Sequence, residues 1–305
     1  MDTSVRLPFS VVIDGRLDPS RARQVAVLAG RLGLAGVWLR WPWWPALTAG
    51  SAGAEGTAGS DPAGLLGWLL SGPHTRAGLL AGQPVTQAGW LDRVGAAPLP
   101  GETGQPGEDT RPFGKIMLGM LPGAGDAGEW RRELARRAGL AVAELAVPAG
   151  PQGDAEGTAL LVPFAPDRDL VASVAAAAGV AAGRAVLAEV AVSVGRTSAE
   201  ARARAGAEEL FTMTGDPAEQ GLFGTLEECQ AAAAALLHAG ATELVCSLPL
   251  ASDLPDVMAQ LTAIAVGARV LRPGEPPSQS PPPPAGWGGR RAAPVLDAGQ
   301  SPAGS

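Results

Sequence analysis

The chain has 305 residues, of which 46% are hydrophobic, so it is long enough for one barrel of roughly 250 residues. Its formal net charge of −7 argues against nucleic acid or an anionic membrane as an obligatory partner. No apolar run reaches the roughly 18 residues that a membrane-spanning helix needs, and the N-terminus lacks the pattern of a signal peptide. We therefore expect a cytoplasmic protein.

Strand and helix signals alternate along the chain, as in parallel βα units. The first helix should begin after Asp18, a good N-cap that is followed by Pro19, and should end before Gly33. The predicted strands cover 9–14, 36–40, 76–81, 115–121, 140–148, 158–164, 185–194 and 243–248. The predicted helices cover 19–32, 61–70, 83–93, 127–138, 226–239 and 254–268, and a further helix follows Thr197. Residues 46–60 and 95–112 are predicted to be loops.

Eight strands are the number that a (β/α)8 TIM barrel requires, so the predicted fold class is α/β, with one such barrel over residues 1–272. The Pro/Gly-rich segment 273–305 cannot bury a core and is expected to be disordered. In an alternative numbering, 115–121 is the fifth strand and a family segment near 95–112 has been lost.

The segment from Phe223 to Leu248 is the most informative part of the chain. Thr225 is a good N-cap, and Glu228 three residues later completes a capping box. The Gly-Thr-x-Glu-Glu cap at 224–228, the Ala-Gly-x-x-Glu-Leu-Val stretch at 239–245 and the upstream segment 192–205 resemble the C-terminal third of the luciferase-like monooxygenases. That resemblance implies a flavin- or deazaflavin-dependent oxidoreductase, with FMN or coenzyme F420 as the electron carrier and a small organic substrate.

One strand end departs from that family pattern. Where the resembling proteins often have an Asp/Glu-His pair at the end of the second strand, this chain has Arg40 and Trp41. The resemblance implies that the histidine donates a proton or contacts the cofactor, so Arg40 and Trp41 are the available catalytic candidates. Trp41, Trp43 and Trp44 are predicted to wall a substrate pocket, although packing over the barrel mouth is an equally good reading. Arg40 would pair with an anionic ring or a substrate carboxylate.

A cofactor phosphate needs backbone N–H donors, which glycine-rich strand ends provide. The cofactor-binding candidates lie after three predicted strands and are Ala81, Gly82, Gly119, Gly195 and Arg196. Ordinary turn chemistry is the alternative explanation for each of them.

Three acidic residues lie in or at the end of predicted strands, namely Asp14, Glu144 and Glu189. A barrel-facing carboxylate at Glu189 would need a partner such as an arginine. One or two buried acids are common in barrels, so a structural role is favoured over catalysis.

The remaining candidates favour structural roles. His74 and His238 precede strands, which places them at the end of the barrel opposite to an active site. Cys246 is expected in the core, and Cys229 and Cys246 make neither a disulfide framework nor a zinc site. No histidine or cysteine spacing indicates a metal site.

Two other functions remain open. A degenerate, non-catalytic paralogue would keep the barrel and act as a partner subunit or binding protein. A sugar-isomerase-like barrel is suggested by residues 136–145, but such enzymes generally need histidine ligands at strand ends. The family commonly forms dimers, which implies a homodimer or a heterodimer with a paralogue.

Overall fold

A computed structural model of the chain describes residues 7–13, 17–41, 62–71, 76–96, 114–149, 157–163, 168–180, 184–207, 221–249 and 253–270. The predicted loop 46–60, nearly all of the loop 95–112 and the predicted disordered tail 273–305 lie outside these residues. Residues 1–271 form one compact unit, which contains every described element.

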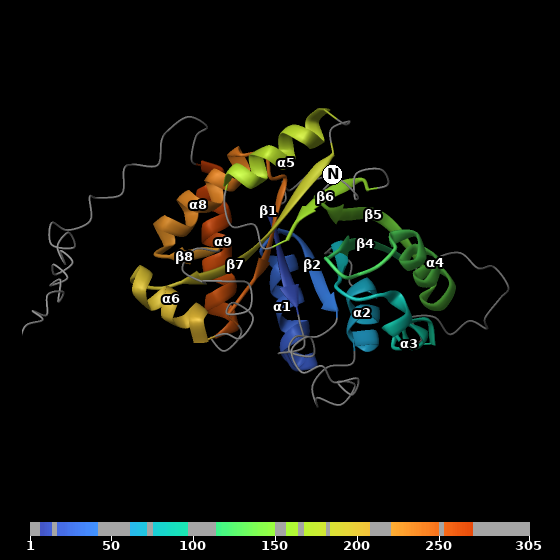
Figure 1. The fold of residues 1–305 in the computed structure, drawn as a ribbon. Coiled ribbons are helices and arrows are strands. Elements are labelled where there is room, and N and C mark those ends of the chain that lie inside the picture. Colours follow the sequence, from blue (N-terminus) through green and yellow to red (C-terminus); the bar gives the residue numbers. More distant parts are fainter. Residues whose placement is uncertain are drawn as a thin grey trace, which may run out of the picture. The chain divides into compact units, whose positions relative to one another are not determined.

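Parallel strands close into a barrel in the order β1-β2-β3-β4-β5-β6-β7-β9 and back to β1 (Figure 1). The barrel strands are β1 Leu7–Ile13, β2 Leu34–Trp41, β3 Arg76–Ala81, β4 Gly114–Met120, β5 Leu140–Pro148, β6 Ala159–Val162, β7 Ala185–Val194 and β9 Glu243–Ser247. A short ninth strand, β8 (Leu222–Gly224), pairs with the last residues of β7. The fold is therefore the (β/α)8 barrel that the sequence predicts.

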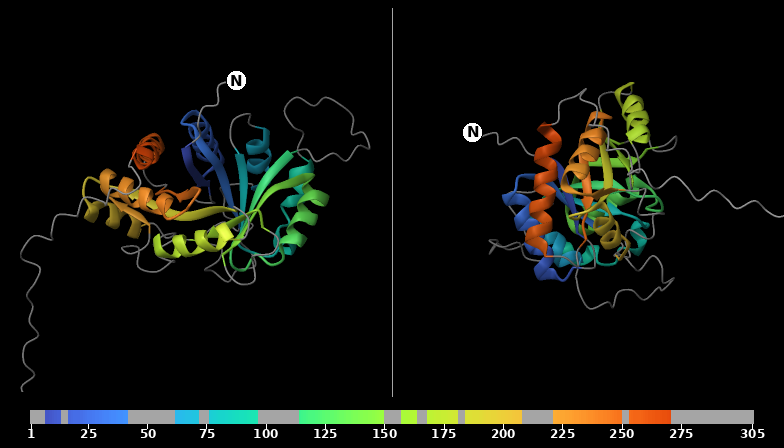
Figure 2. Two further views of the ribbon diagram at one scale, coloured as in Figure 1. Left: turned by 90° about the horizontal axis from the view of Figure 1, so that it is seen from above. Right: turned by 90° about the vertical axis from the view of Figure 1, so that its left-hand side faces the viewer.

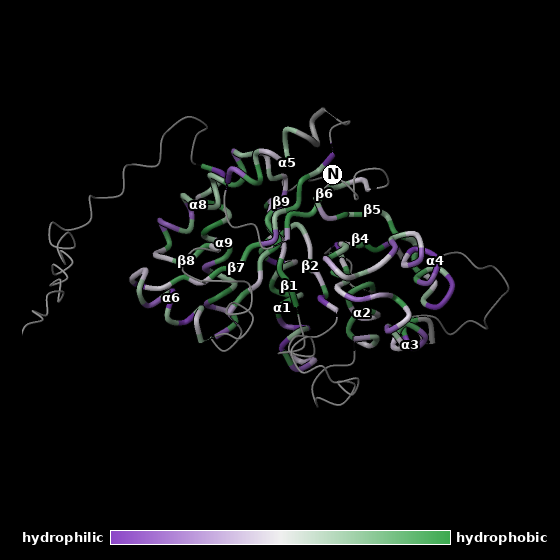
Figure 3. Tube along the Cα trace, in the orientation of Figure 1, coloured by the Kyte–Doolittle hydropathy of each residue, from purple (hydrophilic) through white to green (hydrophobic). Residues whose placement is uncertain are grey.

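Helices lie outside these strands (Figure 2). Their bounds are α1 Pro19–Arg31, α2 Pro62–Ser71, α3 Leu91–Ala96, α4 Ala127–Ala138, α5 Arg168–Val180, α6 Ser198–Ala207, α8 Leu226–His238 and α9 Leu254–Val270, and a 3-10 turn η2 covers Val85–Gln87. Hydrophilic stretches follow the outer helices such as α4, whereas the strands are largely hydrophobic (Figure 3).

The structure corrects three expectations. The single helix predicted over 83–93 is divided into η2 and α3, since Gly89 interrupts it. Helix α5 and strand β8 have no counterpart among the predicted elements. Strand β4 pairs directly with β3, so it is the fourth barrel strand and the alternative numbering is wrong.

Two helix caps form as the sequence predicts. The Asp18 carboxylate accepts hydrogen bonds from the backbone N–H groups of Ser20 and Arg21 at 2.9 and 3.0 Å. At α8, Thr225 N–H donates to the Glu228 carboxylate at 2.8 Å, and Glu228 N–H donates to the Thr225 hydroxyl at 3.3 Å. Both ends of the reciprocal capping box are present.

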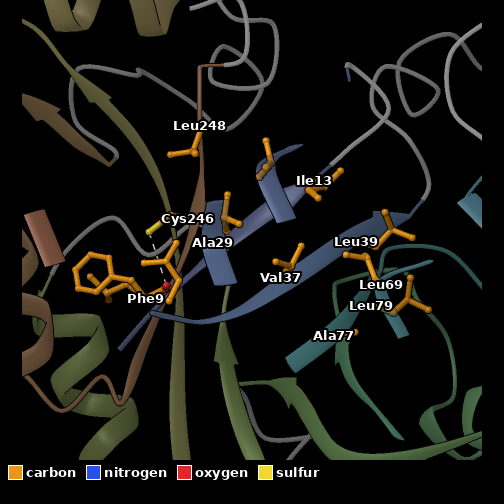
Figure 4. Close-up of a cluster of buried hydrophobic side chains, with 14 of the residues drawn as sticks. Phe9, Ile13, Ala29, Val37, Leu39, Leu69, Ala77, Leu79, Cys246 and Leu248 are labelled. Carbon is orange, nitrogen blue, oxygen red and sulfur yellow. Dashed lines mark hydrogen bonds between the residues drawn. The ribbon is translucent and has the colours of Figure 1, made fainter. Parts of the chain in front are cut away.

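Alternate residues of each strand face the helices and form the outer core. Val37 and Leu39 of β2 and Leu79 of β3 belong to this layer, together with Ala29 of α1 and Leu69 of α2 (Figure 4). The other face of each strand lines the barrel interior.

Trp38 of β2 is fully buried in the barrel interior. The two strands that follow in the barrel provide glycines next to its indole ring. A Cβ at Gly78 would overlap the ring, and a Cβ at Gly119 would lie 2.7 Å from the Leu80 Cδ2 and 3.3 Å from the Trp38 Cζ3. The other interior hydrophobic residues are Val12, Leu80, Met117, Leu121, Ala146, Ala159, Leu161, Leu187 and Val245. The barrel is therefore filled by side chains.

Gly78→Ala should destabilise the protein by about 1–3 kcal/mol, because the added methyl group overpacks the interior against Trp38. Urea unfolding measures this loss. Gly67→Ala is the matched control, since a Cβ there meets nothing within 4 Å and alanine favours a helix. Equal effects of the two substitutions would contradict the packing role of Gly78.

Candidate functional site

In (β/α)8 barrels the active site forms at the C-terminal ends of the strands. Two charged residues lie near this end, Arg40 of β2 and Glu189 of β7, and both face the interior. Their side chains form an ion pair, and the two residues are 2% and 0% exposed. The arginine partner that the sequence analysis requires for Glu189 is thus Arg40.

A second polar group lies at the opposite end of the barrel. The Glu243 carboxylate, at the start of β9, accepts a hydrogen bond from the Ser10 hydroxyl and one from the Trp38 indole at 3.5 Å. Arg76 donates to the same carboxylate at 2.8 Å and lies 3.7 Å from Glu144. Because Glu243 and Arg76 are the first residues of β9 and β3, the group is centred on the N-terminal ends of the strands, and we assign it a role in stability. This group could not be predicted from the sequence, because its members are up to 233 positions apart in the chain.

Ser247 is the last residue of β9 and was also missed by sequence analysis. It faces the interior, because Leu244 and Cys246 belong to the outer core and Val245 to the interior cluster. Its hydroxyl group is buried and has no hydrogen-bond partner among the described residues.

Trp41 faces outward, because Trp38 and Arg40 occupy the inward positions of β2. Its ring centroid lies 6.1 Å from that of Trp90 and 6.0 Å from that of Trp130, which belongs to α4. These contacts place Trp41 in the outer core, between β2 and the helices. Trp43 and Trp44 lie outside the described residues.

The glycines predicted to bind a phosphate have other contacts. Gly82 follows β3, and its N–H donates to the Trp41 carbonyl at 2.7 Å. Gly195 follows β7, and its N–H donates to the Gly224 carbonyl at 2.9 Å. Ala81 is buried as the last residue of β3, and Gly119 faces the barrel interior. The predicted cofactor-binding residues thus lie on or after three different strands. The backbone N–H groups of Gly82 and Gly195 already donate hydrogen bonds within the protein.

Carboxylates already occupy the helix N-termini beyond β7 and β8. Arg196 N–H donates to the Glu200 carboxylate of α6 at 3.0 Å. The Ser198 hydroxyl donates to the Glu228 carboxylate at 2.5 Å, which joins the starts of α6 and α8. The hydrogen bonds from Ser198 and then from Thr225 N–H lower the pKa of Glu228. The Arg196 side chain is exposed and remains as a cation at this edge.

The remaining sequence candidates are two histidines, two cysteines and Asp14. His238 ends α8 and precedes β9, so it lies at the end predicted for it, whereas Asp14 and His74 are outside the described residues. Burial raises the pKa of Cys229 to about 12, and it also raises the pKa of Cys246 well above that of an ordinary thiol. Such thiols are poor nucleophiles.

In the described parts of the chain, no group of three or more His, Cys, Asp or Glu residues is placed to hold a metal ion. None of the helices among these residues combines the length and the hydropathy needed to cross a membrane.

Solved structures with the same fold include three cofactor-dependent enzymes. An F420-dependent secondary alcohol dehydrogenase, in complex with an F420–acetone adduct, has a TM-score of 0.57 at 12% identity and covers 87% of this chain and 100% of its own. The F420-dependent tetrahydromethanopterin reductase of Methanopyrus kandleri has a TM-score of 0.52 at 12% identity, over 86% of this chain and 98% of its own.

The third is a type II Baeyer–Villiger monooxygenase in complex with FMN, the oxygenating constituent of 3,6-diketocamphane monooxygenase from the CAM plasmid of Pseudomonas putida. It has a TM-score of 0.50 at 13% identity and covers 87% of this chain and 98% of its own. No protein-family model and no curated protein sequence matches the chain. At these identities the likeness establishes a shared fold.

FMN and F420 each present a phosphate group and a planar ring that carries carbonyl oxygens. The described residues fit the ring better than the phosphate. Ser247 offers an unused hydroxyl donor at the mouth of the barrel, whereas the amides of Gly82, Gly195 and Arg196 all have acceptors. Among the described candidates, the Arg196 guanidinium is the group left to hold a phosphate.

Replacing one member of the buried ion pair, by Arg40→Met or Glu189→Leu, should cost about 3–5 kcal/mol, because the remaining charge is left buried without its partner. The double variant should lose less than the sum of the two single losses. A double-mutant cycle in urea measures this coupling. Strictly additive losses would show that the two charges do not stabilise each other.

Glu228→Gln should lower stability at neutral pH by about 0.5–1 kcal/mol through the weakened capping box. Because the pKa of Glu228 is lowered in the folded state, this advantage of the wild type is present above the ordinary glutamate pKa. It disappears as the pH falls through the folded-state pKa.

Urea midpoints at neutral and acidic pH measure this difference. Glu227→Gln is the matched control, since Glu227 shares the first turn of α8 but lies outside the capping box. A difference between wild type and Glu228→Gln that persists unchanged in acid would contradict this role of the carboxylate.

Proposed function

We propose that the chain is an oxidoreductase that uses reduced FMN or F420 on a small organic substrate. The observation that carries this proposal is the likeness to three enzymes that depend on F420 or bind FMN, each matched over nearly its whole length. Local sequence features support the same direction, since the capping box at Thr225 and Glu228 is part of the resemblance to the luciferase-like monooxygenases.

The proposed site is the mouth of the barrel at the C-terminal ends of the strands. Arg40, with Glu189, forms its charged floor, and Arg196 contacts the cofactor phosphate. The substrate pocket is proposed to involve Trp41, Trp43 and Trp44. The proposed cofactor-binding rim consists of Ala81, Gly82, Gly119, Gly195 and Arg196.

When bound, FMN or F420 supplies the redox chemistry, and the protein supplies orientation and a dry surface. The packed interior is consistent with a protein that orients the cofactor and excludes water. Trp38 and the hydrophobic residues around it leave the barrel below the Arg40–Glu189 pair dry. In this proposal the Arg40–Glu189 pair, whose charges neutralise each other, is the polar group nearest to the bound ring.

A second candidate is the non-catalytic paralogue that acts as a partner subunit or binding protein. The engaged amides of Gly82, Gly195 and Arg196 favour it, because they weaken the predicted phosphate site. The absence of the family histidine beside Arg40 favours it as well.

Titration of the purified chain with FMN and with F420, oxidised and reduced, should show saturable binding of one cofactor. Arg196→Ala should weaken that binding by about tenfold, because a charge-assisted contact to the phosphate is lost. Arg31→Ala is the control, since Arg31 is exposed in the last turn of α1, at the other end of the barrel. Tryptophan fluorescence follows both titrations.

The outcomes separate the two candidates. Binding of neither cofactor at tens of micromolar would overturn the oxidoreductase proposal and favour the non-catalytic paralogue. Binding that Arg196→Ala and Arg31→Ala leave equally strong would remove Arg196 from the site.

A further inference from the structure

Ser247 differs from the other buried serines of the barrel strands. The Ser10 hydroxyl donates to Glu243, and the Ser193 hydroxyl donates to the Ala201 carbonyl at 3.0 Å. Ser247 is 1% exposed, and its hydroxyl has no such acceptor among the described residues. A buried hydroxyl without a partner costs about 1–3 kcal/mol, so an alanine at this position would serve stability better.

The register of the barrel places this hydroxyl at the mouth. Ser247 pairs with Ala191 of β7, whereas Glu189 pairs with Val245 two residues earlier. At about 3.3 Å per residue, Ser247 lies about 7 Å further toward the C-terminal end than Glu189. Relative to β7, Ser247 therefore lies one inward-facing position beyond Glu189, whereas relative to β1 and β2 it lies one inward-facing position before Arg40.

The chemistry of this position favours a ligand atom that accepts hydrogen bonds. Ser247 offers an O–H donor, and the guanidinium of Arg40 is a donor group as well. The carboxylate of Glu189 is held by Arg40, so it does not compete for the serine proton in the described contacts. A neutral carbonyl oxygen suits these surroundings, because it brings no charge into a buried place where the two charges already balance.

We propose that Ser247 is a ligand-binding residue whose hydroxyl donates a hydrogen bond to a ring carbonyl oxygen of the bound FMN or F420. This inference rests on the proposed function and assigns it a contact on β9 that neither the sequence motifs nor the fold likeness provides. The stability lost at the empty hydroxyl is recovered when the carbonyl oxygen becomes its acceptor.

The test compares Ser247→Ala with the matched variant Ser193→Ala, in cofactor titrations and in thermal unfolding without cofactor. Ser247→Ala should raise the dissociation constant about threefold to tenfold, the range expected for one hydrogen bond. Its melting temperature without cofactor should be equal to or higher than that of the wild type, because an unpartnered polar group has been removed. Ser193→Ala should show the reverse, with a lower melting temperature and unchanged binding, because its hydroxyl already has a protein acceptor.

Each other result has a separate meaning. If the wild type binds a cofactor and Ser247→Ala binds it equally well, the inference is wrong and the proposed function stands. A lower melting temperature of Ser247→Ala with unchanged binding would assign the hydroxyl to folding and also overturn the inference. If the wild type binds neither cofactor, the proposed function and this inference fail together.

Discussion

The burial of Trp38 inside the barrel is the constraint on which the rest of the interior depends. A closed eight-stranded barrel has room for packed side chains and no more, and one indole takes a large share of that room. Glycine is therefore required at residue 78 beside the ring, and Gly119 relieves the same crowding one strand further. The indole N–H, which would be costly to bury alone, has an acceptor in Glu243.

This packing separates the polar groups of the interior into two sets. Glu243, Ser10 and Arg76 lie on one side of Trp38, and the Arg40–Glu189 pair lies on the other. A buried ion pair rarely adds stability compared with a hydrophobic pair of similar volume. The first set is explained by the indole that it supports and by the partly exposed Arg76 that reaches solvent. The second set lies toward the C-terminal ends of the strands, where we propose that a ligand binds.

Local signals made most of the fold predictable, and distant contacts decided what could not be predicted. The capping box of Thr225 and Glu228 and the cap at Asp18 involve residues at most three positions apart, so the sequence alone reveals them. Helix α5 has no described N-cap side chain, and its alanine-rich sequence gives a weak periodic signal. The direction of Trp41 follows from strand alternation only once Trp38 is known to face inward. The partners of Glu243 and the isolation of the Ser247 hydroxyl depend on strands that meet only when the barrel closes.

The N-termini of α6 and α8, which follow β7 and β8, are already bonded to carboxylates of the chain itself. The shared fold therefore does not imply a shared phosphate site. A helix N-terminus attracts an anion through its free N–H groups and its dipole. Here Glu200 and Glu228 supply those anions from within the chain, and Ser198 links the two helices through one of them. A phosphate arriving at this edge would meet two carboxylates, of which Glu200 is already paired with Arg204 at 3.0 Å, and the exposed Arg196 is the candidate cation for it. If the chain binds FMN or F420 as we propose, contacts to the ring would have to supply most of the binding at this mouth. The unused donor at the end of β9 would then contribute more to binding than it would in a barrel whose helix N-termini are open.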